Sequence, residues 1–277
     1  MRLLLSCLLL AACPLGFGAP KPEVRSPDLV LPYRKTEQAE LKLEIFRPAG
    51  WAASDQRPAV VFFFGGGWVG GSTRQFHPQA NHLAKRGMVV ICADYRVKSR
   101  HKTTPFDAVK DAKAAVRWLW RHAGEQGVDP EKIITSGGSA GGHLAACCGV
   151  VPGLDEVRDG EPVFIPAAMV LFNPVIDTSR KGYGYDRLRE RFREISPLEH
   201  VHAGTAPTLL MVGSADTTTP PAGDKAFAAR MKERKLKCRL EIYEGQKHGF
   251  FNARGNNENY WKTLKAVEEF LEELGYL

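Results

Sequence analysis

Short apolar runs alternate with longer amphipathic segments along most of this 277-residue sequence. The runs at 59–64 and 88–93 are apolar at every position, as in strands that are buried on both faces of a sheet. We therefore predict an α/β fold with a mostly parallel central sheet and helices on both faces. The predicted strands are 41–45, 59–64, 88–93, 132–136, 167–172, 208–212 and 239–243, and the predicted helices are 75–86, 106–122, 140–150, 222–234 and 259–274.

Three connecting segments are informative. Residues 21–33 are rich in proline and are predicted to form an extended arm, and residues 128–130 are predicted to form a turn. Residues 179–202 are densely charged and precede the strand predicted at 208–212. We expect them to be a small insert in an otherwise regular α/β alternation.

Residues 1–18 are predicted to be a leader. Arg2 precedes an apolar stretch over residues 3–12, which is too short to span a bilayer. Residues 10–13 resemble a lipobox, in which Cys13 is lipidated, whereas the small residues before Ala19 suit ordinary cleavage; absence of export is the third alternative. The mature domain is predicted at 19–277, in an exported protein that is periplasmic, secreted or lipid-anchored. A membrane is then a partner only through a lipid on Cys13.

Charge and cysteine content exclude several classes of function. The net charge is +7, but no basic tract of the kind that binds nucleic acid occurs, so no nucleic-acid partner is expected. The cysteines beyond the leader region lack the CxxC spacing of zinc or thioredoxin-like sites, so no metal site is expected from them. Buried thiols are favoured over a disulfide for these four residues, which are Cys92, Cys147, Cys148 and Cys238.

The strongest chemical motif is a G-x-S-x-G sequence centred on Ser139, within residues 137–142. It follows a predicted strand and opens a predicted helix, which is the setting of a nucleophile elbow. The turn from strand to helix is so tight that Gly137 and Gly141, two residues on either side of the serine, must lack side chains. Ser139 is therefore predicted to be a catalytic nucleophile, rather than part of an ordinary glycine-rich turn.

A second glycine run, Gly65-Gly66-Gly67, ends the buried strand at 59–64. Backbone N–H groups in such a run can approach a ligand closely. We predict that the N–H groups of Gly66, Gly67 and Ala140 form an oxyanion hole. A phosphate-binding loop fits less well, because the run lacks both the GK[ST] and the G-x-G-x-x-G patterns. A simple tight turn is the remaining alternative.

The candidate base and acid follow later strands. Asp216 comes just after the strand predicted at 208–212, and His248 lies in the loop after 239–243. Ser139, Asp216 and His248 therefore follow in the order Ser–Asp–His, each at the C-terminal end of a strand, where an open parallel sheet collects its site. His248 would take the serine proton and Asp216 would fix the imidazole tautomer. His143 and Asp224 are weaker rivals, because both lie within predicted helices.

These motifs together resemble the α/β-hydrolase superfamily over roughly residues 41–277. The segments Phe64–Trp68 and 138–142 look like those of the hormone-sensitive-lipase-like and feruloyl-esterase-like carboxylesterases, and residues 94–96, 129–130 and 248–250 are also similar. The resemblance implies serine-dependent ester hydrolysis without a metal or other cofactor. One departure is that Phe64 stands where the usual HGGG motif begins with histidine, so we expect altered packing of the loop with its backbone donors retained.

The substrate class is the least constrained expectation. Tyr183 and Tyr185 in the charged insert, with Trp68 after the glycine run, offer flat faces to a sugar ring, although a solvated charged helix explains the insert equally well. The leader and the resemblance favour short acyl esters, acetyl above all, on a plant or algal polysaccharide or oligosaccharide. The alternatives are a general short-chain lipid or aryl ester hydrolase, a feruloyl esterase and, less favoured, a serine peptidase. The sequence makes no prediction of oligomeric state.

Overall fold

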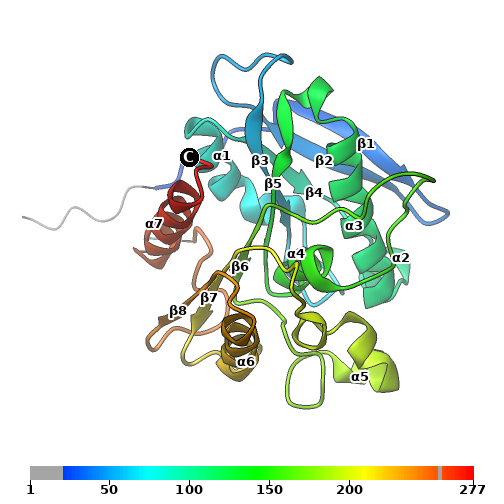
Figure 1. Cartoon of the computed structure of the whole chain (residues 1–277), viewed down its shortest axis with the longest axis vertical. Helices are drawn as coiled ribbons and strands as arrows, with labels where there is room; N and C mark the ends of the chain where they lie inside the picture. The colour runs from blue at the N-terminus through cyan, green and yellow to red at the C-terminus, as the bar shows by residue number, and fades with distance from the viewer. Residues whose placement is uncertain (1–20, 255–257) are drawn as a thin grey trace, which may run out of the picture.

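The computed structural model describes residues 21–254 and 258–277, so the predicted leader, with Cys13, lies outside the described residues. The chain forms one eight-stranded sheet with the order β1-β2-β4-β3-β5-β6-β7-β8 (Figure 1). Strands β3 to β8 run parallel to one another, whereas β1 and β2 are antiparallel to their neighbours. The strands are β1 (Leu29–Lys35), β2 (Glu40–Phe46), β3 (Arg57–Phe63), β4 (Val89–Ala93), β5 (Val128–Gly138), β6 (Ala168–Phe172), β7 (Thr208–Gly213) and β8 (Cys238–Tyr243).

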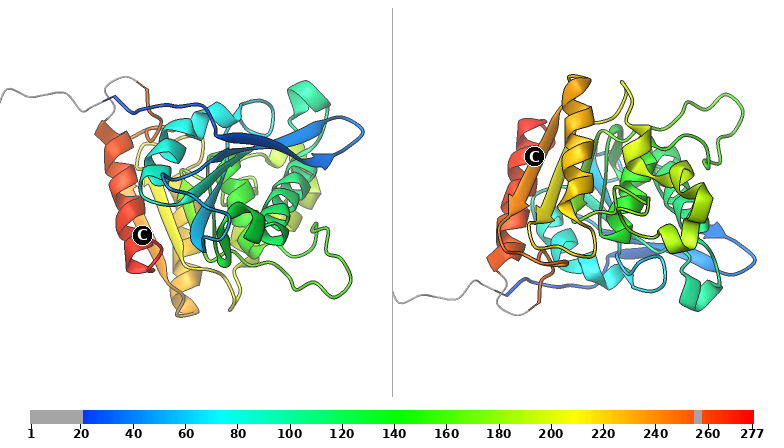
Figure 2. Two further views of the ribbon diagram at one scale, coloured as in Figure 1. Left: turned by 90° about the horizontal axis from the view of Figure 1, so that it is seen from above. Right: turned by 90° about the horizontal axis from the view of Figure 1, so that it is seen from below.

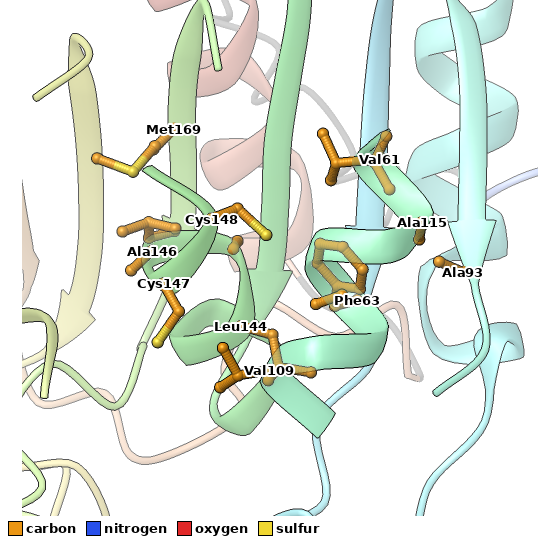
Figure 3. Packing of buried hydrophobic residues seen from close by; sticks show 14 of the residues in the cluster. Val61, Phe63, Ala93, Val109, Ala115, Leu144, Ala146, Cys147, Cys148 and Met169 are labelled. Atoms are coloured by element: carbon orange, nitrogen blue, oxygen red, sulfur yellow. The ribbon is translucent and has the colours of Figure 1, made fainter. Parts of the chain in front are cut away.

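Helices cover both faces of the sheet, as Figures 1 and 2 show. Alternate residues of β3 point to opposite sides, so Val61 and Phe63 join one apolar core and Val60 and Phe62 join the other. Figure 3 shows the first core, where Phe63 lies near Leu144 and Val109. The first core is covered by α3 (Pro105–Arg121), α4 (Ala140–Val150) and α6 (Pro221–Glu233), and the second by α1 (His77–Lys85) and α7 (Glu258–Glu273). The predicted α/β fold with a mostly parallel sheet is confirmed.

Two predictions for connecting segments need correction. The extended arm predicted at 21–33 is only partly right, because Leu29–Lys35 form strand β1, which pairs with β2. The turn predicted at 128–130 is wrong, because these residues open strand β5. The register between β3 and β5 shifts between Arg57 and Ala59. Pro130 therefore lies at an irregularity inside strand β5 and not in a turn before the strand.

The charged insert lies between β6 and β7 and contains only short helical turns. They are α5 (Tyr185–Leu188) and the 3-10 helices η3 (Arg189–Ile195) and η4 (Pro197–His200). The insert is therefore a series of short helical turns and not the single solvated helix that was the alternative. Short helices also occur at η1 (Thr73–Phe76), α2 (Lys98–His101) and η2 (Gly124–Gln126).

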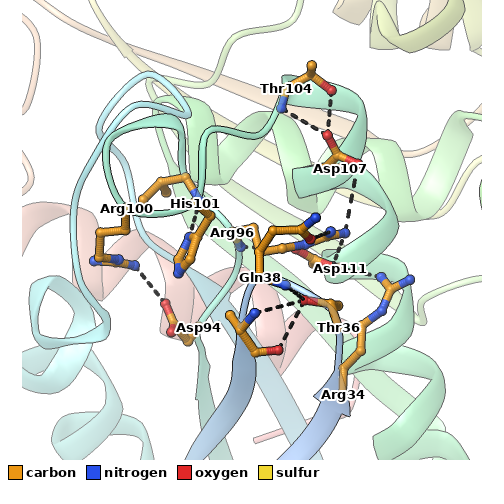
Figure 4. A network of polar contacts seen from close by, with 12 residues as sticks. Arg34, Thr36, Gln38, Asp94, Arg96, Arg100, His101, Thr104, Asp107 and Asp111 are labelled. Carbon is orange, nitrogen blue, oxygen red and sulfur yellow. Dashed lines mark hydrogen bonds and ion pairs between the residues drawn. The ribbon is translucent and has the colours of Figure 1, made fainter.

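A buried carboxylate fastens helix α3 to the antiparallel edge of the sheet (Figure 4). Asp111 is fully buried and accepts hydrogen bonds from the Arg96 backbone N–H at 3.0 Å, Nε at 2.8 Å and Nη2 at 3.0 Å. Arg34 Nη1, from β1, donates to the same carboxylate at 2.7 Å. The negative charge of Asp111 thus joins helix α3 to strand β1 and to the segment after β4. Removing this charge would be costly, because Arg34 and Arg96 are both largely buried.

The four cysteines beyond the leader region are free thiols, and burial raises the pKa of Cys148 to about 12. Within residues 21–254 and 258–277, no three His, Cys, Asp or Glu side chains gather in a way that would hold a metal ion. No helix of this part of the chain is both long and apolar enough to cross a membrane.

Candidate active site

Ser139 lies on the sharp turn that joins β5 to α4. Its backbone has φ 56° and ψ −121°, a strained conformation for a residue with a side chain, and it holds the hydroxyl above the end of the sheet. The flanking glycines are needed sterically. A Cβ on Gly141 would overlap the carbonyl oxygen of Phe63, and a Cβ on Gly137 would overlap the Gly141 backbone. The predicted strand–turn–helix setting of the G-x-S-x-G motif is therefore present.

The structure brings the three side chains of the predicted triad together. His248 Nε2 lies 2.9 Å from Ser139 Oγ, and His248 Nδ1 lies 2.7 Å from Asp216 Oδ2. The serine follows β5, the aspartate follows β7 and the histidine follows β8, so residues separated by up to 109 positions meet where parallel strands end. This geometry is that of a nucleophile, a base and an orienting acid.

The carboxylate of Asp216 is held in its charged form. Burial alone raises its pKa, but hydrogen bonds from His248 and Thr219 outweigh burial and bring the pKa below its usual value. Its Oδ1 accepts from the backbone N–H groups of Thr218 at 2.8 Å and Thr219 at 2.9 Å. The Thr219 hydroxyl donates to Oδ2 at 2.9 Å. A negative charge is therefore fixed on the far side of the His248 ring, where it would stabilise an imidazolium.

The glycine run after β3 lies beside Ser139. Gly65, Gly66 and Gly67 line the same cavity as Ser139 and His248. Among the described residues, the backbone N–H groups of Gly66, Gly67 and Ala140 have no hydrogen-bond acceptor. Unpaired donors at the mouth of a catalytic cavity suit a developing oxyanion, so the placement is consistent with the predicted oxyanion hole.

Gln75 and Asn252 hold this loop in position, but no sequence motif indicates their role. The Gly65 N–H donates to Gln75 Oε1 at 2.6 Å, and Gln75 Nε2 donates to Asn252 Oδ1 at 3.0 Å. The loop after β3 is thus tied to the loop after β8. Asn173 was also missed: its Oδ1 accepts from the Gly249 N–H at 3.1 Å, beside the catalytic histidine. Its position directly after strand β6 was the signal that would have found it.

The cavity at the triad has a volume of about 280 Å³. It continues into an open groove of about 670 Å³, with which it shares Gly65, Gly66, Gln75 and Asn252. Ser72, Arg74 and Arg254 lie along this groove. A small space at the nucleophile therefore opens onto a larger, polar one.

Two of the three predicted substrate contacts, Trp68 and Tyr185, do not line the cavity at the triad. Trp68 is only 2% exposed, and its ring packs edge-on against His143 with centroids 5.0 Å apart, so it belongs to the core. Tyr185 is not among the residues that line this cavity, and it hydrogen-bonds with Glu190 at 2.6 Å and Arg180 at 2.8 Å. Tyr183 does line the cavity with Ser139 and His248. The predicted contact between Tyr183 and a substrate stays a prediction, and the burial of Trp68 is not visible in the local sequence.

His143 and Asp224, the weaker candidates for the base and the acid, are both buried. His143 is fully buried, its Nε2 lies 2.7 Å from the Ile195 carbonyl oxygen, and burial lowers its pKa to about 4. Asp224 is buried in helix α6, and burial raises its pKa well above the usual value. Neither replaces His248 or Asp216 at the serine.

Phe64 takes the position at which the resemblance places a histidine. Its ring is buried and stacks on Tyr95 with centroids 4.1 Å apart, while the Tyr95 hydroxyl donates to the Phe64 carbonyl oxygen at 2.7 Å. The start of the glycine run is therefore anchored by stacking together with a hydrogen bond to the main chain.

Comparison with known proteins places the chain in a family. A family model described as BD-FAE matches residues 43–231, which is most of the chain. The chain belongs to the BD-FAE family. The matched segment contains Ser139 and Asp216, and His248 lies beyond it. The predicted resemblance to the α/β-hydrolase carboxylesterases is thereby confirmed.

Several solved structures and curated relatives that are similar to this BD-FAE chain are named as esterases. The apo form of Thermogutta terrifontis esterase 2 is 48% identical, with a TM-score of 0.85 over 92% of this chain and 97% of that one. The same esterase has been solved phosphorylated by paraoxon, at 47% identity over 90% of this chain and 95% of that one, with a TM-score of 0.84. A "probable isoprenylcysteine alpha-carbonyl methylesterase" of Arabidopsis thaliana is 27% identical over 76% of this chain and 49% of its own length. The chain thus spans about half the length of that curated relative.

Proposed function

We propose that the protein is a serine carboxylesterase that cleaves short-chain acyl esters through an acyl-enzyme on Ser139. The observation that carries the proposal is the 2.9 Å approach of His248 Nε2 to Ser139 Oγ, with Asp216 behind the imidazole. The family and the esterase names of the structural neighbours support the same class of reaction. The proposed chemistry uses side chains and backbone donors of this chain, with water as the second reactant.

The geometry supports the following sequence of steps. His248 Nε2 takes the Ser139 proton as Oγ attacks the ester carbonyl, and the N–H groups of Gly66, Gly67 and Ala140 receive the oxyanion. The imidazolium, stabilised by Asp216, then gives its proton to the leaving alcohol. In the second half, the same imidazole takes a proton from water as the water attacks the acyl-serine. It then returns a proton to Ser139 Oγ as the acyl–oxygen bond breaks and the acid is released.

The natural ester is proposed to be an acetyl or similarly short acyl ester on a polysaccharide or oligosaccharide. Support comes from size and polarity: about 280 Å³ at the nucleophile suits a small group, and the adjoining groove of about 670 Å³ is open and polar. Short aryl or lipid esters and feruloyl esters remain the alternative substrates.

Export is proposed on the sequence alone. Residues 1–18 have the pattern of a leader, and either a lipid on Cys13 or cleavage before Ala19 would follow. The mass of the mature N-terminal peptide tests this directly: a diacylglycerol on Cys13 supports the lipoprotein, a free Ala19 supports secretion, and an intact Met1 contradicts export.

The deciding experiment compares rates of acid release by the purified chain. Acetylated xylan, p-nitrophenyl acetate, p-nitrophenyl octanoate, a feruloylated oligosaccharide and an anilide of acetic acid are offered at matched concentrations. Acetate release from the polysaccharide supports the full proposal. Hydrolysis of aryl esters alone restricts it to a general esterase, and hydrolysis of the anilide at comparable rate contradicts an ester-specific enzyme.

A further inference from the structure

The charged insert reaches over the glycine run through one arginine. Arg187, in helix α5, donates from Nη1 to the Gly67 carbonyl oxygen at 2.6 Å and to the Tyr183 hydroxyl at 3.3 Å. Residues 67 and 187 are 120 positions apart, so this hydrogen bond links the insert to the loop that offers the candidate oxyanion donors. Gly67 has φ +61°, and a Cβ there would overlap the Tyr183 hydroxyl. The tyrosine therefore sits directly against the glycine.

The hydrogen bond from Arg187 leaves the Tyr183 proton unused. A guanidinium only donates, so the tyrosine oxygen accepts and its own O–H remains available. Among the described residues, no acceptor receives that proton. Because Tyr183 lines the cavity with Ser139 and His248, an ester bound there is the natural acceptor.

The positive charge of Arg187 is weakly compensated. Its nearest carboxylate among the described residues is that of Asp186, at 3.9 Å and largely exposed, whereas the Arg187 side chain is 27% exposed. The guanidinium also lies against the rings of Tyr183 and Trp68, 5.3 Å and 5.9 Å from their centroids. A fixed cation beside a hydroxyl group strengthens that hydroxyl as a donor to an anion.

We propose that Tyr183 is a side-chain donor to the oxyanion and that Arg187 is the positioning residue that orients both this hydroxyl and the Gly67 peptide. The inference rests on the proposed ester hydrolysis and assigns a catalytic use to the insert. Negative charge develops on the carbonyl oxygen only during attack by Ser139, so the contribution of Tyr183 belongs to the transition state and should appear in kcat.

The test uses the full chain with Tyr183→Phe, Arg187→Met, Arg187→Lys and the double variant, assayed with p-nitrophenyl acetate. Tyr183→Phe is expected to lower kcat by about tenfold to a hundredfold with KM changed by less than about threefold. Arg187→Met should lower kcat similarly, and Arg187→Lys should recover part of the loss, since it keeps the charge but has a different shape. The double variant should lose little more than the worse single variant, because the two side chains act through one another.

A transition-state readout separates this role from general structural support. Affinity for a boronic acid, which forms a tetrahedral adduct on the serine, should fall in parallel with kcat across the variants, while KM does not. Matched controls in the same insert are Tyr185→Phe and Arg191→Met, whose partners Glu190 and Glu194 face solvent. Both should keep the parent kcat, and thermal unfolding should show all variants folded.

The outcomes distinguish the inference from the function on which it rests. If the parent hydrolyses no ester, or if Ser139→Ala keeps the parent rate, the proposed function fails. If the parent is active and Ser139→Ala is inactive but Tyr183→Phe and Arg187→Met keep kcat within about threefold, only this inference is overturned. A rise in KM without a fall in kcat or boronate affinity, or fully multiplicative losses in the double variant, also overturns it.

Discussion

Replacing Asp216 by asparagine perturbs the triad without changing its shape. In the parent, Asp216 Oδ1 accepts from the two backbone N–H groups of Thr218 and Thr219. These fixed donors require an acceptor, so the carbonyl oxygen of the new amide takes this position and its NH2 group faces the imidazole. His248 Nδ1, 2.7 Å away in the parent, must then accept a hydrogen bond, which places the ring proton on Nε2.

The consequence reaches the nucleophile. Nε2, which lies 2.9 Å from Ser139 Oγ, would then donate instead of accepting, so the serine loses its base and the imidazolium loses its counter-charge. We expect kcat to fall by roughly 10⁴, which corresponds to a rise of about 5.5 kcal/mol in the barrier. The backbone hydrogen bonds to Oδ1 are kept, so the loop after β7 should stay folded.

The assay is steady-state hydrolysis of p-nitrophenyl acetate, with thermal unfolding as the check on folding. Thr219→Val is the matched control: it removes the hydroxyl that donates to Asp216 Oδ2 at 2.9 Å but leaves the carboxylate in place. The loss of one such hydrogen bond should cost less than about tenfold in kcat. If Asp216→Asn keeps kcat within about tenfold of the parent, or if Thr219→Val is as damaging, the tautomer argument is refuted.

Three further outcomes are expected. Asp111→Ala leaves the largely buried Arg96 and Arg34 without their shared carboxylate, so the free energy of unfolding measured with urea should fall by about 3–5 kcal/mol, and a loss below about 1 kcal/mol would contradict the network. Burial raises the pKa of Asp224 in the folded state, so its contribution to the free energy of unfolding falls as the pH rises above the unfolded pKa of about 3.9. The Tm of the Asp224→Asn variant minus that of the parent should therefore increase from about pH 4.5 to about pH 8. A difference in Tm that does not change with pH would contradict this expectation. p-Nitrophenyl acetate should be cleaved faster than the octanoate, because the cavity at the serine is small, and the reverse order would remove the short-acyl proposal.

The parts of the fold that periodicity predicts are those buried on both faces. Strand β4 is apolar throughout and β3 is apolar after Arg57, and helix α4 follows the elbow with the predicted bounds. Strand β1 was missed because Pro32 and the charged Arg34 and Lys35 disguise an edge strand, which needs only one partner. Local sequence does not carry that pairing.

The triad was predictable because each member follows a strand, and parallel strands end at one edge of the sheet. Which tyrosine of the insert lines the cavity was not predictable, because nothing in the local sequence distinguishes Tyr183 from Tyr185. The two hydroxyl groups accept hydrogen bonds from different arginines, Arg187 for Tyr183 and Arg180 for Tyr185, and the folded chain decides where these arginines lie. Trp68 was misread for a related reason: its burial depends on His143, a residue of another element.

The most direct test of the central claim is covalent trapping of the nucleophile. The purified chain is treated with paraoxon, and the modified peptide is located by mass spectrometry while hydrolysis of p-nitrophenyl acetate is followed. A single phosphoryl group on Ser139, appearing in step with loss of activity and absent from Ser139→Ala, is the predicted result. Labelling of a different residue that tracks the activity, or undiminished hydrolysis by Ser139→Ala, would contradict the account.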